Sequence, residues 1–92
     1  MAIKLIKPYK IVQQKIKRYE AHYHVPADRS LVVPVRVLGD EVLCDIRWED
    51  DNGEMRLLEN KVFVAENLIP LDPLMDPKLH EVWAHYYGLN TN

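Results

Sequence analysis

The chain has 92 residues and a formal net charge of −2 at pH 7, with 48% hydrophobic and 28% charged residues. This composition belongs to globular proteins and excludes a disordered chain, and the length predicts a single domain over residues 1–92. The apolar runs are too short to cross a membrane, and the single cysteine, Cys44, cannot form an internal disulfide. We therefore expect a cytoplasmic protein with no membrane partner.

The charges are segregated along the chain. Residues 1–20 hold six cations and one acid, whereas residues 40–76 hold eleven acids and three cations. A dipolar layout of this kind affects the choice and orientation of partners rather than the fold. Two solvated faces of a small protein would give the same pattern, so the layout alone does not identify a partner.

A helical repeat marks the first segment. Apolar residues recur at steps of three and four from Leu5 to Tyr23, which predicts a basic amphipathic helix over residues 8–23. The opposite face of this helix would carry Lys10, Lys17 and Arg18. The β-branched residues leave a strand as the alternative for residues 9–16.

Two apolar runs on either side of Gly39-Asp40 predict a β-hairpin with a type II′ turn. In that register Val37 lies opposite Val42. The other pairs on the same face are also apolar, namely Val35–Cys44, Val33–Ile46 and Leu31–Trp48. Pro34 would fall where the ladder needs an N–H donor, so we expect a bulge or a bend there.

A second hairpin is predicted at Asn52-Gly53, a pair that favours the type I′ turn. Trp48 would then lie opposite Leu57. A longer four-residue loop is the alternative, but it would oppose Glu49 with Glu54, and like charges across a ladder are destabilising. The type I′ register places Trp48 on the apolar face of the sheet, which favours a core role over a binding site.

The last third of the chain predicts two short strands and a helix. The strands cover residues 61–64 and 68–71, with a tight turn between them. Asp76 and Pro77 form a helix start, and an apolar stripe predicts a helix over residues 77–87 that ends at Gly88. The tail at residues 89–92 is expected to fray.

The segments "VLCDIRWEDDNGE" and "VAENLIPL" resemble the central hairpin and the closing turn and strand of SH3-like small barrels, especially Tudor and chromo-type modules and integrase C-terminal barrels. This resemblance of pattern covers residues 31–71. It implies an α+β fold, with a small antiparallel β-barrel of about five strands flanked by an N-terminal and a C-terminal amphipathic helix. Such barrels bind peptides, modified tails or nucleic acid and rarely catalyse. The rim positions that carry cage aromatics in some members are Asp, Glu and Asn here, which disfavours the reading of methyl-lysine.

Catalytic and metal sites find little support in the sequence. The four histidines, at positions 22, 24, 80 and 85, lack the spacing of a zinc site. The alternation of the strand places Cys44 inside, where a thiol is not a nucleophile. Adjacent acids at a hairpin tip are normally solvated. We therefore expect no cofactor, no metal and no catalytic residues.

The remaining hypothesis is a non-catalytic protein-interaction or assembly module. Its candidate binding residues are those of the basic helix and of the acidic hairpin tip, namely Lys10, Lys17, Arg18, Glu49, Asp50 and Asp51. Attraction between these two regions predicts self-association or a protein partner. The alternative is nucleic-acid binding through the basic helix, although the pI of about 6.0 is low for that role.

Overall fold

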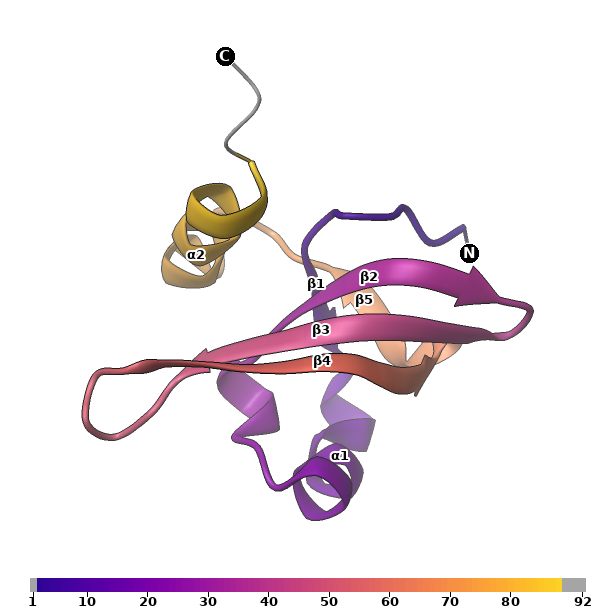
Figure 1. The fold of residues 1–92 in the computed structure, drawn as a ribbon, viewed down its shortest axis with the longest axis horizontal. Helices are drawn as coiled ribbons and strands as arrows, with labels where there is room; N and C mark the ends of the chain where they lie inside the picture. Colours follow the sequence, from indigo (N-terminus) through magenta and orange to yellow (C-terminus); the bar gives the residue numbers. More distant parts are fainter. Residues whose placement is uncertain (1, 89–92) are drawn as a thin grey trace.

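A computed structural model describes residues 2–88 of the chain, so the predicted fraying of residues 89–92 lies outside the described residues. The fold is α+β, with a five-stranded antiparallel sheet in the order β4-β3-β2-β1-β5. The strands are β1 (Tyr9–Ile11), β2 (Leu31–Leu38), β3 (Glu41–Glu49), β4 (Met55–Val64) and β5 (Leu68–Pro70). The helices are α1 (Ile16–Tyr23) and α2 (Pro77–Tyr87), with 3₁₀ turns η1 (Gln13–Lys15), η2 (Ala27–Arg29) and η3 (Ala65–Asn67). Figure 1 shows α1 and α2 on opposite sides of the sheet.

The predicted N-terminal helix over residues 8–23 is correct only for its second half. Residues 16–23 form α1, but β1 replaces the helix at Tyr9 and Ile11, whose side chains are both buried in the period of a strand. The strand alternative for residues 9–16 is therefore correct only for residues 9–11, since residues 13–15 form η1 and α1 begins at Ile16. The physical reason is tertiary, because β1 pairs with both β2 and β5 and closes the gap between them.

The first hairpin forms as predicted next to its turn. Gly39 has a φ of 65°, and Val37 lies opposite Val42. The bulge expected near Pro34 is also present, because the register shifts between Pro34 and Arg36. The shift places Pro34 opposite Cys44, and the Pro34 carbonyl accepts a hydrogen bond from the Ile6 N–H at 2.8 Å. The backbone of Pro34 therefore faces away from β3, and its missing N–H removes no bond to that strand.

The bulge overturns the pairs predicted beyond Pro34. Val33 lies opposite Asp45, and Leu31 lies opposite Arg47 rather than Trp48. A slip of one residue moves side chains to the other face of a sheet. Leu31 and Val33 therefore leave the main core.

The sheet consequently has an apolar cluster on each face. The cluster on the α1 side contains, among others, Tyr9, Ile16, Tyr19, Val32, Val42, Cys44, Ile46, Phe63 and Leu68. The second cluster contains Leu31, Val33 and Leu71, and part of α2 packs against it. The predicted bounds of the C-terminal helix, 77–87, agree with those of α2.

The second hairpin has neither of the two registers that the sequence suggested. Trp48 lies opposite Arg56, and Glu49 lies opposite Met55, so residues 50–54 form the loop. Gly53 has the positive φ expected of it, 80°, but Asn52 does not share that conformation, which rules out a type I′ turn. The Asp50 side chain determines this register, because it accepts hydrogen bonds from backbone N–H groups of the loop.

The strand predicted at residues 61–64 is the end of one long strand, β4. A second register shift, between Cys44 and Ile46, interrupts its pairing with β3, and Asn60 there has a φ of 57°. Because β4 and β5 are the two edges of an open sheet, a closed barrel is not confirmed. Neither helix among the described residues is long and apolar enough to span a membrane.

Candidate functional site

A groove with a volume of about 490 Å³ lies where the β3–β4 loop, η2 and the beginning of α2 meet. Its apolar walls are formed by Trp48, Met55, Met75, Pro77, Leu79 and Val82. Its charged residues are Asp28, Arg29, Arg47, Glu49, Asp50, Asp51, Asp76 and Lys78. An apolar wall with a few polar groups around it is the usual composition of a ligand or peptide site.

The loop at one end of the groove is organised by Asp50. Its Oδ1 accepts hydrogen bonds from the backbone N–H groups of Asn52 and Glu54, both at 2.9 Å. Its Oδ2 accepts a third from Arg56 Nε at 2.8 Å. The bond from the Glu54 N–H, followed by that from Arg56, lowers the pKa of the Asp50 carboxyl. The negative charge of Asp50 therefore shapes the loop.

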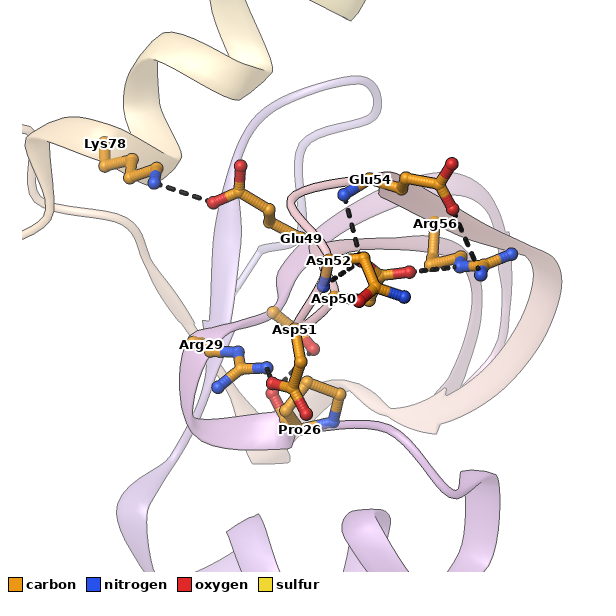
Figure 2. A network of polar contacts seen from close by, with 10 residues as sticks. Pro26, Arg29, Glu49, Asp50, Asp51, Asn52, Glu54, Arg56 and Lys78 are labelled. Carbon is orange, nitrogen blue, oxygen red and sulfur yellow. Dashed lines mark hydrogen bonds and ion pairs between the residues drawn. The ribbon is translucent and has the colours of Figure 1, made fainter.

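Two ion pairs connect this loop to the other walls of the groove, as Figure 2 shows. Lys78 Nζ at the start of α2 lies 2.7 Å from Glu49 Oε1, and Arg29 of η2 lies 3.3 Å from Asp51 Oδ1. These side chains are well exposed, so each pair contributes little to stability. They mark where the elements around the groove meet, because one pair joins the end of β3 to α2 and the other joins the loop to η2.

The far end of α2 is held to the sheet by a polar cluster. Arg47 Nε donates a hydrogen bond to the Tyr87 hydroxyl at 2.9 Å, and that hydroxyl donates to Asp45 Oδ2 at 3.2 Å. The Arg47 guanidinium also lies 3.9 Å from the centre of the Tyr86 ring, a cation–π contact. Burial raises the pKa of Tyr87, so this hydroxyl keeps its proton at neutral pH.

Trp48 has both of the roles considered for it from the sequence, a core residue and a residue of a binding site. It is only partly buried, and it packs against the main core from the edge. It also lines the groove. The predicted core role is therefore incomplete, because the shifted register places Trp48 beside the loop and opposite Arg56 instead of deep under the sheet.

The candidate residues of the acidic tip lie together, whereas those of the basic segment do not. Glu49 and Asp51 border the groove, but both are already in ion pairs within the chain. Lys10 lies in β1 and pairs with Asp76 at 3.2 Å, while Lys17 and Arg18 lie on α1, on the other side of the sheet. The structure therefore does not bring the six predicted residues into one site.

Sequence reasoning missed the apolar walls of the groove. The stripe of the last helix included Leu79 and Val82, but the periodicity could not show which part of the stripe would face the sheet. For Met75 the only signal was an apolar residue next to a predicted helix start, and the meaning of that signal depends on where α2 docks.

The remaining candidate groups are the Cys44 thiol and the possible metal ligands. Cys44 is fully buried, and burial raises its pKa to about 12, so the thiol stays protonated. Among residues 2–88, no group of three or more histidine, cysteine and acidic side chains is arranged to hold a metal ion. Comparisons of the chain with protein-family models, with curated proteins and with solved structures found no match.

Proposed function

We propose that this protein is a non-catalytic protein-interaction module, and that its groove binds a short segment of a partner protein. The observation that carries the proposal is the combination of apolar walls with a charged border in a groove of about 490 Å³. A volume of this size accommodates a few side chains of a peptide. The groove is open, so a segment can enter it from the surface.

The walls of the groove suit an apolar anchor residue. Trp48 provides a rigid aromatic surface, while Met55 and Met75 provide flexible, polarisable side chains that adapt to different shapes. Met75 borders the groove and is 76% exposed. Exposed apolar residues that border a groove are typical of an interaction surface.

Five acids and three cations border the groove, and four of the acids form ion pairs within the chain, so most of the negative charge at the border is compensated. A strongly basic or acidic ligand would have to displace these pairs. We therefore infer that the partner segment is mainly apolar, with polar groups at its ends. The buried, protonated thiol of Cys44 supports a role without catalysis.

We also interpret the sheet as an SH3-like barrel that is left open between β4 and β5. The support is the meander β2-β3-β4 followed by a 3₁₀ turn, η3, and the short strand β5 that pairs with β1. This interpretation fits a binding role, because such barrels serve mainly as binding modules.

Selection of peptides from a random display library tests the groove. The substitution Met75→Glu places a charge in the apolar wall, and Leu74→Glu is the matched control, since Leu74 is more exposed and does not line the groove. We expect selected apolar peptides to bind the unchanged protein and the Leu74→Glu variant alike. Binding to Met75→Glu should be weaker by roughly tenfold. Fluorescence anisotropy of labelled peptides measures both.

Equal binding to both variants would show that the peptides use another surface, and the absence of any selected peptide would contradict the proposal. Nucleic acid remains the alternative partner, since Lys17 and Arg18 are exposed and form no ion pair within the described part of the chain. Binding of duplex DNA at physiological salt, with a steep dependence on salt concentration, would favour that alternative.

A further inference from the structure

One half of the sheet face that carries α2 is not covered by a helix among residues 2–88, and we call it the bare face. Its apolar residues are Leu38 of β2, Leu43 of β3, and Val62 and Val64 of β4. They are contiguous, because Leu43 lies directly opposite Val62, and both Leu38 and Val64 lie opposite Glu41. The exposed fractions of Leu38, Val62 and Val64 are 44%, 42% and 36%.

The register shows that these residues share the face of α2. Side chains two positions apart on a strand point to the same side, so Leu43 shares a face with Asp45 and Arg47, which both contact Tyr87 of α2. The helix packs over Leu31 and Val33, at the other end of β2. Within residues 2–88, no helix covers the end near the Gly39 turn, where Figure 1 shows the N-terminal segment running beside β2.

Two opposite charges lie within this bare face. Arg36 is directly opposite Leu43, and Glu41 is directly opposite Leu38, so the two charged residues are diagonal neighbours on adjacent strands. Both are exposed, and neither forms an ion pair within residues 2–88. Together with Leu38 and Leu43 they form a four-residue cell, with charges on one diagonal and leucines on the other.

We propose that a second copy of this chain docks on the bare face through a two-fold axis that runs along the Leu38–Leu43 diagonal. The axis brings Leu38 and Leu43 onto the same residues of the second copy. It also brings Arg36 onto Glu41 of the second copy, and Glu41 onto Arg36 of the second copy. The patch is thus self-complementary, which is the requirement for a two-fold dimer interface.

Edge-to-edge pairing through this end of β4 would compete with hydrogen bonds within the chain. The Tyr23 hydroxyl donates a hydrogen bond to the Val62 carbonyl at 2.7 Å, and the Val64 N–H donates to the Tyr19 hydroxyl at 3.5 Å. One outward backbone group at each of these positions is therefore bonded to an α1 side chain. Pairing along this end of β4 would have to break these bonds, which favours the face of the sheet over its edge for a second copy.

Sedimentation equilibrium over a range of protein concentrations tests this dimer. We expect the unchanged chain to dimerise, and Leu38→Asp to prevent it, because a carboxylate would be buried against its own copy. The matched control is Val37→Asp. Val37 is 46% exposed and lies next in sequence, but it points to the opposite face, so this variant should dimerise normally.

The charge pairs are tested by exchange. Arg36→Glu alone and Glu41→Arg alone each create two like-charge contacts in a two-fold dimer, and each should raise the dissociation constant by roughly tenfold. The double variant Arg36→Glu/Glu41→Arg restores both pairs with the charges exchanged, and it should dimerise like the unchanged chain. Circular dichroism of every variant confirms that the fold is retained.

A chain that stays monomeric up to about 1 mM would overturn the proposal, since even a weak interface is populated there. If Val37→Asp disrupts the dimer as strongly as Leu38→Asp, the interface is not confined to the bare face, and the proposal is wrong. If the double variant does not dimerise like the unchanged chain, the proposed position of the two-fold axis is wrong. The proposal does not depend on the groove, which lies at the other end of the β3–β4 hairpin, and peptide binding is measured with different variants.

Discussion

Replacing Tyr87 by Phe tests how the end of α2 is held on the sheet. The substitution keeps the ring and removes the hydrogen bond from Arg47 at 2.9 Å and the one to Asp45 at 3.2 Å. A hydrogen bond to a charged group contributes about 1.5–3 kcal/mol. All three side chains are only partly buried, however, and water replaces much of what is lost. We therefore expect Tyr87→Phe to lower the free energy of unfolding by about 1–2 kcal/mol.

The neighbouring residue provides the control. Tyr86 is 38% exposed, and its ring, which lies against the Arg47 guanidinium, is retained in Tyr86→Phe. Its hydroxyl forms no hydrogen bond with the described residues, so the loss should stay below about 0.5 kcal/mol. Urea denaturation followed by circular dichroism gives the two midpoints and slopes. Equal losses for the two variants would refute the view that the hydroxyl of Tyr87, and not aromatic packing, anchors the helix.

Three further predictions concern the hairpin and the core. Gly53→Ala should destabilise the protein by about 1 kcal/mol, because φ at this position is 80°, while Asn52→Ala should cost less in the same denaturation assay. The lowered pKa of Asp50 means that its stabilisation is present above the ordinary value of 3.8 and is lost as the pH falls through the lower folded-state pKa. Acid titration of Asp50→Asn should therefore show a smaller loss of stability in this range, and an unchanged profile would contradict the assignment. Cys44 should react with a thiol reagent at pH 8 only as fast as the protein unfolds, and rapid labelling of the native protein would show that the thiol is accessible.

The sequence indicated the positions of both turns and the register next to the first one, but not the type of the second turn or the register beyond the bulge. Gly39 and Gly53 both have the positive φ that their turns require, and the bulge expected near Pro34 is present. The offset of the second hairpin could not be read from strand pairing alone. It depends on the Asp50 carboxylate, which binds the N–H groups of Asn52 and Glu54 and stabilises a longer loop.

The N-terminal segment shows a second limit. The apolar spacing from Leu5 to Tyr23 satisfied a helix, yet Tyr9 and Ile11 are buried as residues of a strand. In such a stretch, the same apolar residues fit both the period of a helix and the period of a strand. The choice is made by β5, which lies about sixty residues away along the chain and pairs with β1 through Lys10 and Ile69, among others.

The candidate groove was beyond sequence reasoning for the same reason. The sequence identifies the acidic residues at 49–51, but it predicts that they form a solvated hairpin tip that attracts a basic helix. In the structure Glu49 binds Lys78 and Asp51 binds Arg29, so these acids form part of a wall. Only the docking of α2 beside the hairpin makes that wall, and nothing local to either segment specifies it.

The bulge at Pro34 explains both surfaces that we assign to binding. Without the extra residue, Leu31 and Val33 would point to the α1 side, and the other face would have no apolar patch at that end to hold α2. The bulge turns these two residues over, and α2 docks there. Its first turn then completes the groove, while its last turn ends at Tyr87 and leaves Leu38, near the Gly39 turn, 44% exposed. One irregularity in β2 thus places the helix, and the position of the helix determines where the groove begins and which part of the sheet stays bare.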